Sequence, residues 1–305
     1  MEKKTTLNNK KSLATKFTPL SIVLLVVLII YSLSIFGILI WALLNGLKNP
    51  DVADMQIVNH EFYLLPKLNE FYNHIPAVFK YFIVRTPTGR SVDMWTMLFN
   101  SVYYAITNAI ASTIVPCVTA YCCARFPFKF SKFLHSMVLV VMIIPIVGST
   151  PASLDMAMTL GIYNNLYFYW RMHAHFLGIY FLIFYNAFKT FPASFVEAAK
   201  IDGASNMQIM LKVSFPLIAN MMVTVWLLYF MQYWNEYTVP YLYLPEYPTI
   251  ANGFFQVMDG TAQGDLNNFP AQIMAALLVV SPVLVLFCAF QKRIMGGLTV
   301  GGIKG

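Results

Sequence analysis

Charged residues are scarce in this sequence. Only 11% of its 305 residues are Asp, Glu, Lys or Arg, whereas 58% are hydrophobic. Soluble domains carry about 25% charged residues, so this chain cannot cover its surface in water, and an all-α polytopic membrane protein is the expected class. Cysteine is scarce too, and its placement in or beside apolar spans does not indicate a disulfide framework. We expect all four cysteines to be small buried side chains: Cys117, Cys122, Cys123 and Cys288.

The side-chain groupings of enzymes and metalloproteins are missing as well. The sequence has no glycine-rich phosphate loop, no cluster of metal ligands and no nucleophile beside a base. His173 and His175 are two residues apart, a spacing that does not put both on one helical face. Asp155, at the outer edge of a predicted span, is the deepest carboxylate, whereas a proton or sodium relay needs one within the membrane. These absences disfavour an intramembrane enzyme and a secondary transporter, and we expect no catalytic residue, metal or cofactor in this chain.

Six stretches without charge are long enough for membrane helices, which need about 20 apolar residues. The first span, 19–45, follows several lysines but is too long for a cleaved signal peptide and has no prompt cleavage site. The fourth stretch is the weakest candidate for a span, and we expect its helix to be short, tilted or preceded by re-entrant backbone. The six stretches lie between Lys16 and Lys48, Asp93 and Arg125, Lys132 and Asp155, Arg171 and Lys189, Lys212 and Glu236, and Asp265 and Lys292.

The distribution of charge predicts the orientation of the chain. With the N-terminus inside, most lysines and arginines fall in cytoplasmic segments and most acidic residues in external ones, as the positive-inside rule requires. The net charge of +7 therefore indicates membrane orientation and not nucleic acid binding. We expect a multi-pass protein of the bacterial cell membrane with both termini cytoplasmic. Its expected segments are a cytoplasmic N-terminus 1–18, a first span 19–45, an external loop 46–95, a five-helix core 96–291 that contains a cytoplasmic loop 191–216, and a cytoplasmic glycine-rich tail 292–305.

The external loop 46–95 allows two interpretations. A segment of this length usually folds on itself or contacts something, and it is rich in aromatic residues. It could pack as a cap over the first two spans, or it could form part of a docking surface for an external partner. The sequence leaves both open.

Polar side chains form a stripe in the second predicted span. Asn100, Tyr104, Asn108 and Ser112 recur every four residues and therefore lie on one side of a helix. Polar groups at membrane depth face the protein interior or a water-filled path, because lipid offers them no partner. The stripe fits hydrogen bonding between helices and also the lining of a solute path.

A second polar group lies at the end of the fifth predicted span. Gln232 and Asn235 share a helical face at i, i+3 spacing. The neighbouring Tyr233 and Trp234 fit an aromatic belt at the membrane surface, and they equally fit stacking on a sugar ring whose hydroxyls meet the amides. The predicted solute-path residues are thus Asn100, Asn108, Gln232 and Asn235.

One long segment looks helical but cannot cross the membrane: FPASFVEAAKIDGASNMQIMLKVSFPLIAN, residues 191–220. Pro192 suits the first turn of a helix, and Gly203 stands where a left-handed C-terminal cap is expected. Ser205 with Gln208 predicts a capping box that opens a second helix. Pro216 should kink this second helix as it enters the membrane.

This segment resembles the cytoplasmic loop of permease subunits of bacterial binding-protein-dependent ABC importers. The pattern of that family is Glu-Ala-Ala, three residues, Gly, nine residues, then Ile-x-Leu-Pro. The present sequence has Glu-Ala-Ala at 197–199 and Gly203, followed by Val213, Phe215 and Pro216. The sequence WNEY at 234–237 and the glycine-rich ending resemble the carbohydrate-uptake branch, which includes a permease of maltose transporters. The resemblance extends from about residue 95 to the C-terminus.

The resemblance implies a type I importer permease with the MetI-like fold, six transmembrane helices and both termini in the cytoplasm. It implies a second homologous permease in the membrane lipid, two cytoplasmic ATPases that use ATP and Mg, and an extracytoplasmic solute-binding protein. The implied solute is a carbohydrate; a polyol or a glycerol-phosphate derivative fits the same side chains, and a membrane scaffold whose helix only recruits a partner is a further alternative. The implied ATPase-coupling residues are Glu197, Ala198, Ala199, Asp202 and Gly203.

Overall fold

The structure, a computed structural model, describes residues 18–61, 72–126, 128–144, 148–261, 266 and 268–299. Within these residues the chain is helical except for loops and one two-stranded antiparallel sheet. The elements in chain order are α1 (Pro19–Gly46), α2 (Pro50–Val58), α3 (Ile75–Tyr81), β1 (Ile83–Arg85), β2 (Ser91–Asp93), α4 (Met94–Arg125), α5 (Lys129–Ile143), α6 (Thr150–Thr159), the 3-10 turn η2 (Tyr169–His173), α7 (Ile179–Thr190), α8 (Ala193–Ile201), α9 (Asn206–Ile209), the π-helical turn η3 (Met210–Ser214), α10 (Phe215–Leu217), α11 (Ala219–Asn235), α12 (Thr238–Tyr243), α13 (Ile250–Gln256), the π-helical turn η4 (Val257–Thr261) and α14 (Phe269–Thr299).

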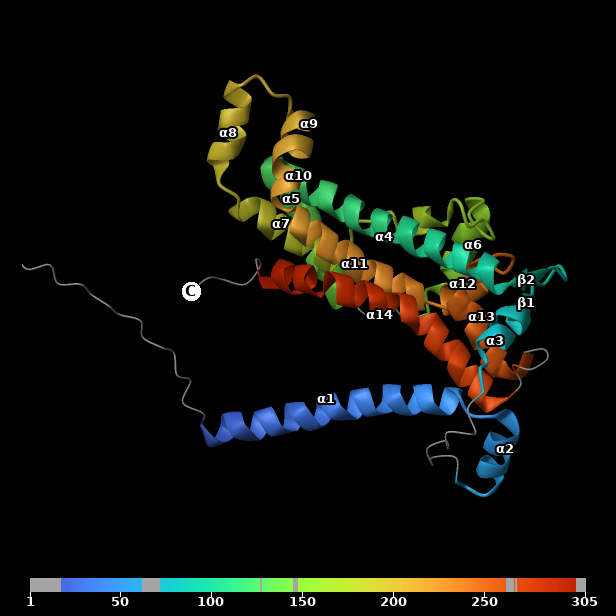
Figure 1. The fold of residues 1–305 in the computed structure, drawn as a ribbon. Helices are drawn as coiled ribbons and strands as arrows, with labels where there is room; N and C mark the ends of the chain where they lie inside the picture. Colours follow the sequence, from blue (N-terminus) through green and yellow to red (C-terminus); the bar gives the residue numbers. More distant parts are fainter. Residues whose placement is uncertain are drawn as a thin grey trace, which may run out of the picture.

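The helices α4 and α11 form the centre of the bundle. α4 packs along α11 and α7, and α11 also packs on α14. Two hydrophobic cores result, one around Tyr104 and Trp234 and the other around Tyr121 and Phe184. α4 contributes to both cores, and its 32 residues make it about 48 Å long at 1.5 Å per residue. In Figure 1 the β1–β2 hairpin and the α8–α9 pair lie at opposite ends of the molecule, and α4 runs between these ends.

Three helices in the described part of the chain are long and apolar enough to cross a membrane: α1, α4 and residues 269–292 of α14. A fourth is added if Asn206–Leu217 and Ala219–Asn235, which meet at a bend of 75°, count as one span. α5 has 15 residues and α7 has 12, fewer than the about 20 that a straight span needs. The expectation of a short fourth helix is therefore confirmed by α7, whereas the count of six spans stays a prediction.

The third predicted stretch is not one continuous helix, contrary to the sequence-based expectation. α5 ends at Ile143, and α6 begins at Thr150 with Pro151 in its first turn, where a helix needs no N–H donor. Gly148 lies before this new start with φ at +77°, a conformation that glycine adopts without strain. Pro145 falls outside the described residues. The absence of charged residues from this stretch therefore did not reveal that two separate helices occupy it.

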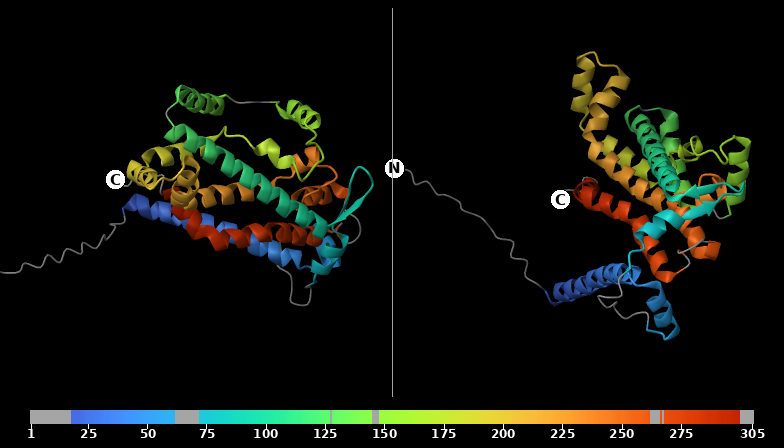
Figure 2. Two further views of the ribbon diagram at one scale, coloured as in Figure 1. Left: turned by 90° about the horizontal axis from the view of Figure 1, so that it is seen from above. Right: turned by 45° about the vertical axis from the view of Figure 1, so that its right-hand side comes forward.

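Among the described residues, α1 meets the rest of the chain only near its C-terminal end. Nearly all its side chains are exposed up to about residue 40, whereas Asn45 and Gly46 are buried. A Cβ at Gly46 would lie 3.3 Å from Ile273 in α14, so this contact is close. Figures 1 and 2 show α1 diverging from the bundle towards the N-terminus. The exposed aliphatic surface is suited to lipid.

The predicted external loop 46–95 contains α2, α3 and the β1–β2 hairpin. α2 and α3 pack against α14, and β1 packs against α13. These contacts fit the interpretation of the loop as a cap, which rests on α13 and α14 and also meets α4, where Phe79 stacks on Trp95 at 5.1 Å. His74 Nε2 lies 2.8 Å from the Lys48 carbonyl oxygen and connects the cap to the end of α1. Residues 62–71 lie outside the described part.

The turn of the β1–β2 hairpin is bound to the loop that follows α12. The N–H and Oγ1 of Thr88 donate hydrogen bonds of 3.1 and 2.7 Å to the two carboxylate oxygens of Glu246. Arg90 donates to the backbone carbonyl of Glu246. The hydrogen bond from the Thr88 side chain is the main reason why the pKa of the Glu246 carboxyl is lowered.

The C-terminal end of the core 96–291 differs from expectation. α14 continues beyond Lys292 to Thr299, so the predicted glycine-rich tail 292–305 begins within a helix, and residues 300–305 lie outside the described part.

All four cysteines are free: Cys117 and Cys123 are buried, Cys122 is half-buried, and Cys288 is exposed on α14. The expectation of burial is therefore wrong for Cys288.

α13 approaches α4 closely at Gly253. A Cβ on this residue would overlap Met97 Sδ and lie 3.4 Å from the ring of Phe82. We expect Gly253→Ala to lower the stability of the purified protein by about 1–3 kcal/mol, the usual cost of overpacking a core. Thermal melting in detergent measures this loss.

Two further variants make the Gly253 prediction specific. Adding Met97→Ala to Gly253→Ala should recover part of the lost stability, because it removes the overlapping sulfur. Gly37→Ala is the matched control, since a Cβ at Gly37 in α1 meets nothing within 4 Å. A Gly253→Ala protein that melts at the wild-type temperature contradicts the prediction.

Candidate functional site

α8 and α9 form a helical hairpin that projects from the bundle (Figures 1 and 2). α8 spans nine residues and none of them is buried. The predicted short helix is thus present, although Pro192 is the residue before its first turn and not inside it. All five predicted coupling residues lie in α8 or in the turn that follows.

The turn after α8 is held by its own backbone. Gly203 has φ at +77°, and its N–H donates to the Lys200 carbonyl at 3.0 Å. The N–H of Ala204 donates to the Ala199 carbonyl at 2.9 Å. These two bonds are the Schellman arrangement at a helix C-terminus, so the predicted left-handed cap is confirmed. Because the backbone makes these bonds, the turn does not need the Glu197 carboxylate to hold it.

The second helix begins with the predicted capping box. The Ser205 N–H donates to Gln208 Oε1 at 2.8 Å, and the Gln208 N–H donates to Ser205 Oγ at 3.3 Å. The chain then passes through η3 and α10 and bends by 75° into α11. Pro216 lies in α10, just before the bend, and its missing N–H and ring both disrupt a continuous helix. The predicted kink is therefore confirmed.

The surface of this hairpin is largely apolar and open. Phe195 is 50% exposed, Ile201 86% and Met207 61%. Glu197, Ala198, Asp202 and Gly203 are also exposed, and Ala199 is half-buried. Exposed apolar side chains together with a carboxylate on a projecting element are typical of a surface that contacts another protein.

Arg125 fixes the base of the hairpin to the C-terminal end of α4. Its Nη2 donates to the Phe191 carbonyl at 3.3 Å, and its guanidinium lies 5.2 Å from the centre of the Phe191 ring. The Phe191 ring in turn lies 5.4 Å from that of Phe195 in the first turn of α8. A short chain of contacts therefore connects α8 to α4.

Tyr121 of α4 packs against both stems of the hairpin. Its ring meets Phe188 of α7 edge-on at 5.2 Å and Phe215 of α10 at 6.4 Å. Phe188 and Phe215 also contact each other at 6.3 Å. Because α7 leads into the hairpin and α10 leads out of it, Tyr121 holds the two ends together. Sequence reasoning missed Tyr121 and Arg125, since neither belongs to a local pattern.

The polar stripe on α4 is buried inside this chain. Asn100 Nδ2 donates to the Pro248 carbonyl at 3.0 Å, and Ser112 Oγ lies 2.7 Å from Tyr233 Oη. Asn108 Nδ2 donates to the Tyr104 carbonyl one turn earlier at 2.6 Å. These contacts fit the first interpretation of the stripe, hydrogen bonding within the bundle, because Asn100 and Asn108 are only 4% and 1% exposed.

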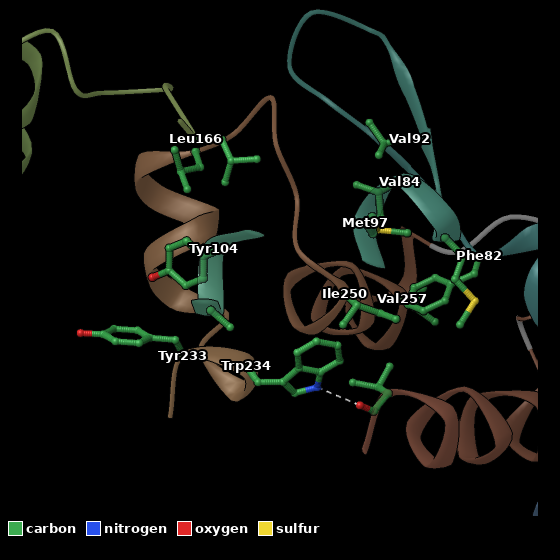
Figure 3. Close-up of a cluster of buried hydrophobic side chains, with 14 of the residues drawn as sticks. Phe82, Val84, Val92, Met97, Tyr104, Leu166, Tyr233, Trp234, Ile250 and Val257 are labelled. Atoms are coloured by element: carbon green, nitrogen blue, oxygen red, sulfur yellow. Dashed lines mark hydrogen bonds between the residues drawn. The ribbon is translucent and has the colours of Figure 1, made fainter. Parts of the chain in front are cut away.

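The aromatic residues near the end of α11 are not at the surface. Tyr233 and Trp234 are both buried, and Trp234 Nε1 donates to the Val279 carbonyl of α14 at 3.1 Å (Figure 3). Neither ring can serve in an aromatic belt or stack on a sugar, so both interpretations of this pair are wrong. Gln232 and Asn235, in contrast, are exposed on α11. The four predicted solute-path residues are therefore divided between the interior and the surface.

His173 is half-buried and packs against Tyr233 of α11. Its Nδ1 is 3.0 Å from Tyr233 Oη, and its ring lies 4.7 Å from that of Tyr233. In the described part of the chain no three His, Cys, Asp or Glu side chains come together as metal ligands.

Comparison with known proteins identifies relatives of this chain. Residues 112–295, which include the whole α8–α9 hairpin, match the family described as binding-protein-dependent transport system inner membrane component. The arabinooligosaccharides transport system permease protein AraQ of Halalkalibacterium halodurans is 26% identical over 216 residues, 69% of this chain and 75% of AraQ. The melibiose/raffinose/stachyose import permease protein MelC of Bacillus subtilis is 29% identical over 202 residues, 65% of this chain and 72% of MelC. The fold is similar to that of a bacterial ABC transporter involved in the import of the acidic polysaccharide alginate, with a TM-score of 0.69 and 22% identity over 90% of this chain and 95% of that chain.

Proposed function

Because the chain belongs to the family of binding-protein-dependent transport system inner membrane components, we propose that it is the permease subunit of an ABC importer that takes up a carbohydrate. The observation that carries this proposal is the projecting α8–α9 hairpin, in which Glu-Ala-Ala at 197–199 precedes a glycine turn at 203. The names of the relatives AraQ and MelC support an oligosaccharide as the solute.

The chain is a multi-pass protein of the cell membrane and has the MetI-like permease fold. Six spans with both termini cytoplasmic are part of the proposal. The distribution of lysine and arginine supports this orientation. α5 and α7 supply the two short spans, and the bent pair of α9–α10 with α11 supplies another. In this arrangement the α8–α9 hairpin lies in the cytoplasm and the β1–β2 hairpin outside the cell.

The hairpin is the proposed docking element for a separate ATPase. Its exposed apolar side chains at Phe195, Ile201 and Met207 suit an apolar groove, and the exposed Glu197 can pair with a cationic group of the partner. Two ATPase subunits that use ATP and Mg would bind this chain and a second homologous permease. An extracytoplasmic solute-binding protein would deliver the solute. Movement of the ATPases then shifts α8, and through it α4, so that the bundle alternates between outward and inward access.

Fewer residues of this chain line the proposed solute path than the sequence suggests. Gln232 and Asn235 are exposed on α11 and can face the second permease across a path between the two subunits. Asn235 Nδ2 already donates to the Met231 carbonyl at 2.8 Å, which leaves its Oδ1 for a solute hydroxyl. Asn100 and Asn108 bond to their own chain and would contribute to the shape of the bundle.

Reconstitution tests the proposed function. This chain is produced together with the ATPase and second permease encoded by neighbouring reading frames, purified, and placed in proteoliposomes with the solute-binding protein. We expect the subunits to co-purify and a labelled oligosaccharide to enter the vesicles only when ATP and Mg are present on the ATPase side. If neither an ATPase nor a second permease co-purifies, the proposal is wrong and a membrane scaffold becomes the better interpretation.

The same preparation separates the solute classes. A ligand screen on the binding protein, followed by uptake of each ligand that it retains, tests oligosaccharides, polyols and glycerol-phosphate derivatives in parallel. Uptake of a polyol or a glycerol-phosphate derivative without uptake of any sugar would keep the importer assignment and reject the carbohydrate.

A further inference from the structure

A cluster of polar side chains lies where α4, α11 and the η2 turn meet. Tyr233 Oη is at its centre, 2.7 Å from Ser112 Oγ and 3.0 Å from His173 Nδ1. The Tyr233 ring also lies 5.9 Å from the ring of Tyr104, which it meets edge-on. One hydroxyl of α11 thus contacts Ser112 of α4, 121 residues away in sequence, and His173 of η2, 60 residues away.

Three polar atoms of this cluster are buried and have no hydrogen-bond partner among the residues that the structure describes. They are Tyr104 Oη, Asn108 Oδ1 and His173 Nε2. Tyr104 and Asn108 are each only 1% exposed, so bulk water does not reach them. Native proteins leave few buried polar groups without a partner, because each one costs free energy. Three of them in one cluster indicate a ligand.

The side chains that carry these atoms lie close to one another, because Tyr104 and His173 both contact the ring of Tyr233. Tyr104, Asn108 and Ser112 follow one another at intervals of four residues and share one face of α4. Tyr104 and Ser112 both contact Tyr233, so Asn108, which lies between them, faces the same way. His173 reaches the same hydroxyl from η2. In Figure 3 the hydroxyls of Tyr104 and Tyr233 point to the same side of the core.

We propose that this junction binds internal water, held by Tyr104 Oη, Asn108 Oδ1 and His173 Nε2. The amide oxygen only accepts, the tyrosine hydroxyl donates or accepts, and the role of the histidine nitrogen depends on its tautomer. Water both donates and accepts, so it satisfies all three groups with either tautomer. Buried waters typically make about three hydrogen bonds, which is the number of free groups here.

The bound water gives the junction a role in the architecture of the bundle. Ser112, Tyr233 and His173 already form a direct hydrogen-bonded chain from α4 through α11 to η2. Water between Asn108 or Tyr104 and His173 adds a second connection from α4 to η2, parallel to the first. α4 is also the helix that Arg125 and Tyr121 join to the hairpin. The hydrated junction therefore fixes the middle of α4.

Tyr104→Phe tests this proposal, because it removes the free hydroxyl and leaves the ring. In the assembled, purified transporter we expect the melting temperature to fall by about 2–4 °C, which corresponds to the loss of one hydrogen bond. If the hydroxyl had no partner, its removal would leave the melting temperature unchanged or raise it, and either result overturns the proposal. Tyr241→Phe is the matched control, since Tyr241 is 50% exposed on α12, and it should melt like the wild type.

The melting temperature of a second variant and a density map of the wild-type assembly test the bound water independently of Tyr104→Phe. Asn108→Leu replaces the amide with an apolar side chain of similar size, and it should lower the melting temperature when water is bound and raise it when the space is dry. Should that variant fail to fold, a high-resolution density map of the wild-type assembly decides. Density for a water within hydrogen-bonding distance of two of the three atoms supports the proposal, and an empty space there overturns it.

Discussion

Gly203→Val is expected to reduce solute uptake by the reconstituted transporter about 10-fold or more, while the protein still inserts into the membrane. Gly203 has φ at +77° in the turn between α8 and α9. A β-branched residue in this conformation is strained by about 1–3 kcal/mol, and each 1.4 kcal/mol corresponds to about a factor of 10 in an equilibrium. The turn would relax to another conformation, and α8 would lose its position relative to α9. ATP-dependent uptake into proteoliposomes measures the effect.

The controls for Gly203→Val separate strain in the turn from a general loss of the protein. Gly203→Asn should retain most of the uptake, because asparagine tolerates the left-handed conformation better than other side chains. Gly37→Val makes the same chemical change in α1, where a Cβ meets nothing within 4 Å, and it should transport normally. Wild-type uptake by Gly203→Val would refute the assignment of this hairpin to coupling.

The shape of the hairpin could be predicted from the sequence because its bonds are local. The Schellman turn at Gly203 and the capping box of Ser205 with Gln208 each close within a few residues. Such features depend on residue type and spacing and little on the rest of the fold. The kink at Pro216 was predictable for the same reason, whereas the short fourth helix was predictable from the length of its charge-free stretch.

The contacts between distant segments could not be read from the sequence. An aromatic pair at the end of a span looks the same whether it faces lipid or the core, and only the packing of α14 shows that Trp234 is buried. The bond from Arg125 to Phe191 joins residues 66 positions apart, which no local pattern connects. The break between α5 and α6 was missed for another reason, since counting charges does not detect a discontinuous backbone.

Tyr121→Ala is expected to lower the amount of solute transported per ATP hydrolysed. Tyr121 is 3% exposed and holds Phe188 of α7 and Phe215 of α10 in edge-on contact. Truncation of a buried aromatic side chain to alanine costs about 3–5 kcal/mol, here at the point where both stems of the hairpin rest on α4. The hairpin would still offer its exposed tip to the ATPase, so ATP hydrolysis should continue, but its movement would no longer be passed on to α4.

The ratio of solute uptake to ATP hydrolysis is the informative measurement for Tyr121. A variant that is only unstable loses both activities in proportion as the protein unfolds, so its ratio stays constant, whereas a broken connection lowers the ratio in the protein that remains assembled. Tyr121→Phe is the matched control, because it retains the ring that contacts Phe188 and Phe215, and it should keep the wild-type ratio. An unchanged ratio in Tyr121→Ala would mean that the connection from hairpin to α4 runs through Arg125 and Phe191 alone, and the same measurement on Arg125→Met would then show the loss.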